Sequence, residues 1–281
     1  MVDKFYRRVA QLVISGNFGT ELGNLRRREG DRVLFQRPMP KPWYDWSQRR
    51  INTLAAGLEA KRYLEIGIYR GNTIERVNAA ERVGVDPAPK VDLSSLPPGC
   101  SVFSMTSDAY FASLDPLTTF DLAFVDGLHT FEQTRTDLFN ALRHVPVGPI
   151  LLDDTVPEDE AASLPDLAAA IAHRRQSGSK KIAWMGDVWK LVIYIDRFLP
   201  QLDFRTIVGS GNEQTLVWRR QRGETIVERA GSELGELSYR ETFANGVPAL
   251  FRPCAESEAL EVCLNAVREH RLDTRRRHRF H

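Results

Sequence analysis

Short apolar runs alternate with amphipathic stretches through the middle of the chain. Five segments are predicted to hold one strand each: KRYLEIGIYRG, which runs into a glycine turn, RVGVDP, SVFSM, FDLAFVDG and GPILLDD. Between them, residues 129–145 repeat apolar positions at helical spacing, and 73–81 and 108–114 have the same character. This alternation predicts a mostly parallel sheet covered by helices on both faces, an α/β fold.

The flanking regions extend this core. Ser47 is a candidate N-cap for a helix with apolar positions through Leu58, and 204–208 and 214–220 have the composition of two closing strands, which brings the expected sheet to seven. We therefore divide the chain into an N-terminal helical or lid segment, a ligand-binding domain and a C-terminal extension, with bounds 1–58, 59–220 and 221–281.

Composition narrows the classes of protein that fit. The chain has 281 residues, 42% hydrophobic and 27% charged, and a formal charge of +1. This balance argues against a dedicated binder of nucleic acid or membrane surfaces, and no apolar run reaches the ~18 residues of a spanning helix. Three scattered cysteines and no convincing secretory signal lead us to expect reduced thiols and a cytoplasmic location.

Acidic residues follow the predicted strands, and ligands of open parallel sheets bind at those carboxyl ends. The positions are Glu65, Asp86, Asp108, Asp126, Asp153 and Asp154. After the first strand, Gly67 and Gly71 let a ligand approach the backbone, and a helix starting near Thr73 would offer free N–H groups. Tyr69 replaces the second glycine of the dinucleotide fingerprint, and the chain contains no phosphate-binding P-loop sequence. Asp86 could accept hydrogen bonds from ribose hydroxyls, which supports binding of adenosine without choosing the cofactor.

The ordered series resembles the class I S-adenosylmethionine-dependent methyltransferases. The glycine pattern at 65–71 resembles their first motif, while VDGLH (125–129) and LLDD (151–154) resemble the metal-dependent O-methyltransferase branch, which includes catechol and macrolide-sugar O-methyltransferases. The resemblance implies a Rossmann-like sheet with S-adenosylmethionine as cofactor. Its cofactor-binding positions would be Glu65, Gly67, Tyr69, Gly71, Thr73, Asp86, Ser107, Asp108 and Asp126.

The resemblance also implies one Mg²⁺, held by Asp126, Asp153 and Asp154, beside the acceptor hydroxyl. The pair Asp153-Asp154 departs from the Asp-Asn and Glu-Asp pairs of the two named branches. His129 occupies the position of a catalytic base. A hydroxyl is a poor nucleophile at neutral pH and must lose its proton to attack the methyl group. A metal would lower the pKa of the hydroxyl, and a neutral imidazole would take its proton.

These features lead us to expect O-methylation of a small hydroxylated acceptor, with sugars among the candidates. A nucleotide-cofactor oxidoreductase and a non-catalytic binding module stay open as alternatives. Trp43, Tyr44 and Trp46 could form a lid or anchor the N-terminal segment, and the arginine-rich last 14 residues are typical of a solvated end. The segment GDVWKL (186–191) has no assigned role, and the sequence leaves a homo-oligomer open.

Overall fold

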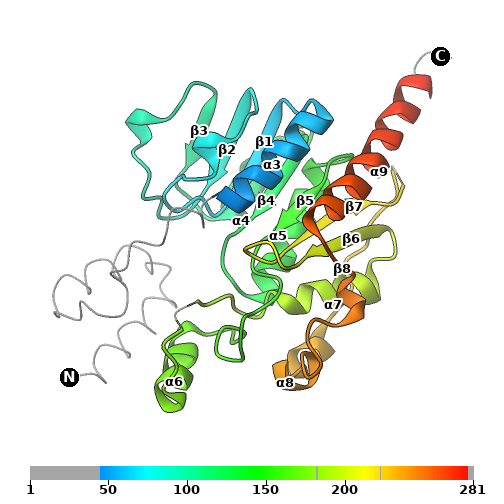
Figure 1. Ribbon diagram of the computed structural model, residues 1–281. Coiled ribbons are helices and arrows are strands. Elements are labelled where there is room, and N and C mark those ends of the chain that lie inside the picture. Colours follow the sequence, from blue (N-terminus) through cyan, green and yellow to red (C-terminus); the bar gives the residue numbers. More distant parts are fainter. Residues whose placement is uncertain (1–44, 182, 222, 278–281) are drawn as a thin grey trace.

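The computed structural model describes residues 45–181, 183–221 and 223–277 (Figure 1). Trp43 and Tyr44 therefore lie outside the described residues. One sheet of eight strands, in the order β3-β2-β1-β4-β5-β7-β6-β8, forms the centre. The strands are β1 (Arg62–Ile66), β2 (Glu81–Val85), β3 (Cys100–Phe103), β4 (Leu122–Val125), β5 (Ile150–Leu152), β6 (Leu202–Ile207), β7 (Gln214–Arg219) and β8 (Pro253–Cys254).

The first five strands are parallel, and β7 is antiparallel to both β5 and β6. The chain moves outward from β1 to β3 and then returns to place β4 on the other side of β1. Strand order therefore reverses between β1 and β4, which is where open α/β sheets bind ligands. The expected mostly parallel α/β sheet is confirmed, with β8 from the C-terminal region as an additional strand beside β6.

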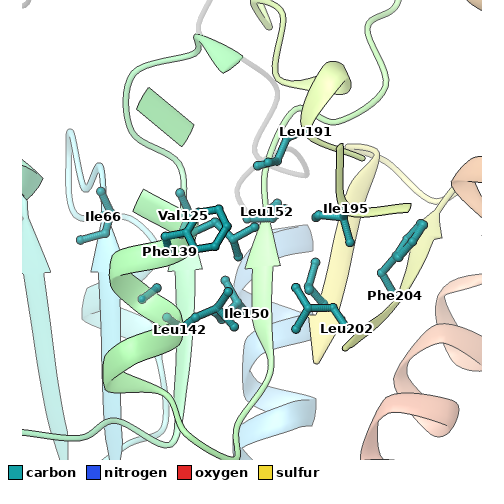
Figure 2. Packing of buried hydrophobic residues seen from close by; sticks show 14 of the residues in the cluster. Ile66, Val125, Phe139, Leu142, Ile150, Leu152, Leu191, Ile195, Leu202 and Phe204 are labelled. Carbon is teal, nitrogen blue, oxygen red and sulfur yellow. The ribbon is translucent and has the colours of Figure 1, made fainter. Parts of the chain in front are cut away.

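Helices cover both faces of the sheet because successive strand residues point to opposite sides. On one face, Leu64 and Ile66 belong to a cluster with α4 (Ser107–Ser113), α5 (Phe131–His144) and α7 (Trp189–Phe198). Figure 2 shows this packing, with Phe139 and Leu142 of α5 against Val125 and Ile150. On the other face, Tyr63 belongs to the cluster with α3 (Asp45–Leu58) and α9 (Glu256–Arg277).

The C-terminal region continues the core. After β7, a 3-10 turn (Ser232–Glu236), α8 (Tyr239–Thr242) and a second 3-10 turn (Ala249–Phe251) lead into β8 and α9. Arg268 Nε donates to the Gly57 carbonyl at 2.9 Å, and Arg271 Nη2 lies 3.1 Å from Asp121 Oδ1. These two arginines of the basic end therefore attach α9 to the last turn of α3 and to the start of β4.

Two local predictions were wrong. Residues 73–81 form only a 3-10 turn, Ile74–Arg76, instead of a helix. The Arg82 guanidinium donates to the carbonyls of Glu75 and Val77 at 3.1 and 3.4 Å, and so occupies acceptors that an α-helix would use internally. Ser47 is not an N-cap, because α3 already begins at Asp45.

Between α5 and α7 lies α6 (Leu167–Ser177), and a 3-10 turn, Leu93–Ser95, lies between β2 and β3. Within the described residues, no helix has the length and apolar character needed to cross a membrane.

The core on the α5 face makes a prediction about stability. Leu138 on α5 is fully buried, and Leu117, in a loop, is 87% exposed. We expect Leu138→Ala to lower the free energy of unfolding by about 2–5 kcal/mol, because it leaves a cavity under α5. Leu117→Ala should change it by less than about 0.5 kcal/mol. Urea unfolding of the two variants measures both, and equal effects would contradict this assignment of the core.

Candidate active site

The backbone ladder brings the predicted acids to one edge of the sheet. The residue that follows each of four neighbouring strands donates its N–H to the adjacent strand. The donors are Asp86 after β2 (3.1 Å), Gly67 after β1 (2.8 Å), Asp126 after β4 (2.8 Å) and Asp153 after β5 (3.0 Å). Because these strands are parallel and adjacent, the four residues lie in a row across the point where strand order reverses.

The backbone segments in this row pack so closely that position 67 must be a glycine. Its φ is +84°, and a Cβ there would lie 1.8 Å from the backbone carbonyl oxygen of Asp126. No side chain fits at that distance, so the turn after β1 packs directly against the end of β4. This contact brings the glycine loop up to the acids that follow β4 and β5.

Asp86 connects the glycine loop to the end of β2. Its Oδ2 accepts the backbone N–H of Tyr69 at 2.8 Å, and its Oδ1 accepts that of Ala88 at 2.7 Å. Tyr69 has φ +41° and a half-exposed side chain. Each carboxylate oxygen has a further lone pair for a ligand, so Asp86 can position the loop and bind a hydroxyl at once. Thr73, by contrast, precedes only the 3-10 turn, and no helix N-terminus faces the site there.

Ser107 and Asp108 open α4 and are connected to α5 by a residue that the sequence analysis missed. Gln133 Nε2 lies 3.3 Å from Ser107 Oγ and 3.2 Å from both Asp108 Oδ1 and Asp137 Oδ1. Burial raises the pKa of Asp137 to about 6. The spacing of Gln133 and Asp137, four residues apart on one helix, was the available signal.

Glu65 is buried in β1, with 2% of its surface exposed. The Tyr63 hydroxyl donates to Glu65 Oε2 at 2.7 Å. Burial raises the pKa of Glu65 to about 8, and this hydrogen bond only partly opposes the shift. Glu65 therefore lies beneath the row of strand ends as a group that holds a proton near neutral pH.

The acids after β4 and β5 form a coupled group. Burial raises the pKa of Asp126 well above its ordinary value, and the neighbouring Asp153 and Asp154 add to the effect. Burial also raises the pKa of Asp153 to about 6, and a hydrogen bond joins the Asp126 and Asp153 side chains. Two carboxylates this close repel each other when both are charged, which favours the protonated form of the pair.

His129 lies against the same acids. Its Nδ1 is 2.9 Å from Asp154 Oδ2, and its Nε2 is 3.6 Å from Asp126 Oδ1. Burial by itself would lower the pKa of His129, but the charge and hydrogen bond of Asp154 outweigh it and leave the pKa raised. Asp154 has a φ of +54°, a left-handed conformation that is uncommon outside glycine and more readily tolerated by Asp. The predicted base and two predicted acids are therefore in contact.

The segment before α7 encloses His129. The ring of Trp184 lies 5.6 Å from the imidazole, centre to centre. Gly186 has φ +64°, and a Cβ there would lie 1.5 Å from the His129 carbonyl oxygen. Asp187 Oδ1 accepts the N–H of Phe131, the first residue of α5, at 2.7 Å. The GDVWKL sequence therefore has a structural role, since its glycine and aspartate hold the loop that carries His129.

A buried network beneath Asp153 was also missed by the sequence analysis. Gln214 Nε2 donates to Asp153 Oδ1 and to Ser47 Oγ, both at 2.7 Å, and the Asn212 side chain also donates to Asp153. The fully buried Arg50 donates to Gln214 Oε1 at 2.6 Å. This bond orients the Gln214 amide so that its NH₂ group faces Asp153. The five residues come from four parts of the chain, α3, the end of β5, β7 and the β6–β7 turn, so periodicity along the chain carried no signal for their contacts.

A hollow of about 10 Å³ lies beside Asp126, His129 and Asp153, which is close to the volume that one water molecule needs. In the part of the chain that the structure describes, no group of three or more His, Cys, Asp and Glu side chains is arranged to hold a metal ion. Asp154 is turned toward His129, so the three predicted metal ligands do not surround one point.

Comparison with known proteins identifies the class. Residues 64–155 match the model of methyltransferase family 24, described as a methyltransferase domain. The match begins in β1 and ends just past Asp154, so it spans the row of strand ends described above. Residues 64–155 therefore match a methyltransferase domain, which supports an S-adenosylmethionine-dependent methyltransferase. The oxidoreductase alternative receives no support from this match.

Among solved structures, an O-methyltransferase from Bacillus cereus in complex with SAH is 17% identical, with 77% of this chain and 98% of that chain covered and a TM-score of 0.44. The N-methyltransferase NodS from Bradyrhizobium japonicum is 15% identical, with 64% and 97% covered and a TM-score of 0.41. The plantazolicin methyltransferase BpumL is 12% identical, with 77% and 96% covered and a TM-score of 0.47. The chain has no match among curated proteins. Similarities at this level do not identify the acceptor.

The buried Glu65 makes a prediction about pH. With a pKa of about 8 when folded and 4.5 when unfolded, its proton is held by the folded chain over that interval and lost by the unfolded chain. This group therefore makes stability fall as pH rises from 4.5 to 8, by about 1.4 kcal/mol for each pKa unit of difference. Glu65→Gln, which keeps an acceptor for Tyr63, should remove that part of the slope and gain stability relative to the parent at pH 8.

Urea unfolding at pH 5, 6.5 and 8 measures this difference. Glu261→Gln, at an exposed position of α9, is the control and should leave the slope unchanged. A parent and a Glu65→Gln variant with parallel pH profiles would show that Glu65 ionises normally in the folded protein.

Proposed function

We propose that the enzyme transfers the methyl group of S-adenosylmethionine to a hydroxyl of a small molecule, with His129 as general base and a divalent cation beside it. The observation that carries the proposal is the contact of His129 with Asp154 and Asp126 at the strand ends of a methyltransferase domain. A base and a group of carboxylates at this edge answer the two needs of O-methylation, deprotonation of the hydroxyl and control of its orientation.

His129 is suited to take a proton from the acceptor. A neutral imidazole that donates Nδ1–H to Asp154 retains the lone pair of Nε2, on the side of Asp126. Asp154 then stabilises the imidazolium that forms when the hydroxyl loses its proton. Gly186 and Asp187 prevent the loop from moving away, because one packs on the His129 backbone and the other binds the start of α5.

The acids beside His129 offer the oxygen ligands that a hard divalent cation such as Mg²⁺ prefers. A cation would replace the proton that the raised pKa values of Asp126 and Asp153 favour at these carboxyls, and the adjacent hollow has about the volume of one water molecule. Asp154, which holds His129 Nδ1 through Oδ2, would offer its other carboxylate oxygen to the set. When bound, the cation would act as a Lewis acid and lower the pKa of the acceptor hydroxyl.

For the cofactor, we propose that Gly67, Gly71 and Asp86 form the near wall of the site, with Ser107 and Asp108 at the adenine end. Asp126 borders both this wall and the acids of the proposed cation site. Glu65, Tyr69 and Thr73 complete the proposed set. Of these, Glu65 is buried and Tyr69 contributes through its backbone, so we expect their roles to be in positioning the loop.

Loss of Asp86 should weaken cofactor binding. Asp86→Ala removes the acceptor of two ribose hydroxyls, and hydrogen bonds to a charged group are each worth about 1.5–3 kcal/mol. We expect the affinity for S-adenosylmethionine to fall by roughly tenfold or more, as measured by calorimetry. Asp92→Ala, in an exposed loop after β2, is the control and should bind normally. A folded Asp86→Ala protein with parental affinity would limit Asp86 to its contacts with Tyr69 and Ala88.

Activity measurements should distinguish the role of the base from the role of the cation. We expect EDTA to abolish methyl transfer to hydroxylated acceptors, Mg²⁺ to restore it, and cofactor binding to persist throughout. His129→Ala should bind cation and cofactor but turn over ~10²–10⁴-fold more slowly. Calorimetric titration of the apoprotein with Mg²⁺ or Mn²⁺ tests the cation independently of turnover, and Asp153→Asn should weaken it.

Full activity in EDTA would reject the cation and leave His129 as the activating group. Near-parental turnover of His129→Ala would reject the base. Absence of methyl transfer to any hydroxylated acceptor, together with transfer to an amine or thiol, would overturn O-methylation.

A further inference from the structure

A buried arginine lies between the candidate active site and the C-terminal helix. Arg50 of α3 is fully buried, and its planar guanidinium carries five N–H groups in a fixed arrangement. All five donate, to acceptors in the β6–β7 turn, in β7 and in α9. Among these acceptors, the one that carries a charge is Glu256 Oε2, which lies 2.9 Å from Arg50 Nε. Figure 1 shows α3 and α9, whose first residue is Glu256, on the same face of the sheet.

Gln214 separates this arginine from the acid at the end of β5. Its Oε1 accepts from Arg50 Nη1 at 2.6 Å, and its Nε2 donates to Asp153 Oδ1 and to Ser47 Oγ, both at 2.7 Å. The carbonyl oxygen and both hydrogens of the amide are therefore in use. A reversed amide would face Asp153 with its oxygen and Arg50 with its NH₂ group, and both contacts would be repulsive. The orientation of Gln214 toward Asp153 thus depends on the position of the Arg50 guanidinium.

Two acids act on Arg50 from opposite ends of this series of contacts. Burial lowers the pKa of Arg50, and the negative charges of Glu256 and Asp153 oppose that effect. Glu256 is in direct contact with the guanidinium, whereas Gln214 lies between the guanidinium and Asp153. A buried charge without a partner is unfavourable, so loss of Glu256 would leave Arg50 attracted toward Asp153. The guanidinium would then release the Gln214 amide.

We propose that Glu256 is a positioning residue for Asp153: it holds the Arg50 guanidinium, and Arg50 fixes the Gln214 amide that donates to Asp153 Oδ1. The C-terminal region, which lies outside the residues 64–155 that match the methyltransferase model, therefore contributes to the orientation of an acid at the candidate site. The consequence for catalysis rests on the proposed function, in which Asp153 takes part, whereas the positioning itself can be measured without turnover.

The side-chain amide of Gln214 reports directly on these contacts. In the full-length protein, labelled with ¹⁵N at glutamine side chains and free of methyl donor and cation, its NMR signal is assigned from its absence in Gln214→Glu. We expect Glu256→Ala to shift this signal toward the position of solvent-exposed glutamine amides and to speed the exchange of its protons with solvent. A folded Glu256→Ala protein with the parental Gln214 signal would overturn the proposal.

Two matched variants separate this effect from a general loss of contacts at α9. Arg49→Ala removes the exposed ion pair of Glu256 but leaves its contact with Arg50, and Glu258→Ala changes an exposed acid in the same turn of α9. Both should keep the parental Gln214 signal, and a shift in either one equal to that of Glu256→Ala would reject the specific role of Glu256. If Glu256→Ala does not fold, Glu256→Gln keeps the shape of the side chain without its charge and decides the same question.

Kinetic measurements connect the positioning to catalysis. With a hydroxylated acceptor, Glu256→Ala should lower kcat by about tenfold or more, the range for losing an outer hydrogen-bond partner of an active-site group. The KM for S-adenosylmethionine should stay unchanged, because Asp86 and the glycine loop lie at other strands. A shifted Gln214 signal with parental kcat would support the positioning role and reject the part of Asp153 in the proposed reaction. An unshifted signal would reject the positioning role whatever the rate.

Discussion

The parallel register of β2, β1, β4 and β5 is the constraint on which the site depends. Each strand ends at the level where its neighbour ends, and the next residue donates its N–H to the adjacent strand. Four chain segments that are far apart in sequence therefore place a glycine or an aspartate in one row. Close approach at Gly67 makes the row compact, since any side chain there would overlap the backbone of Asp126.

Compactness has an electrostatic consequence. Asp126, Asp153 and Asp154 converge at the strand ends, and burial together with their mutual repulsion raises the pKa values of Asp126 and Asp153. The protein balances this charge with hydrogen bonds to Asp153 from Asn212 and Gln214, and with His129 beside Asp154. A group of acids maintained at this cost is consistent with a role in binding a cation and activating a hydroxyl.

Residues outside the strand ends also contribute to the site, and some of them come from near the two ends of the described chain. Arg50 of α3 orients Gln214, and the segment 184–187 encloses His129. The C-terminal region adds β8 to the sheet beside β6. The extensions on both sides of the methyltransferase core therefore pack against the sheet that carries the site.

The sequence by itself determined the alternation of strands and helices, the acids at the strand ends and the position of His129, because these follow from local periodicity and from spacing along the chain. It misjudged residues 73–81, where Arg82 takes carbonyls that the predicted helix needed. It also could not indicate Arg50, Gln214 or Gly186, whose partners lie in other elements. Only the tertiary structure decided which way Asp154 turns and how strongly the acids interact, since both depend on burial and on contacts between segments distant in sequence.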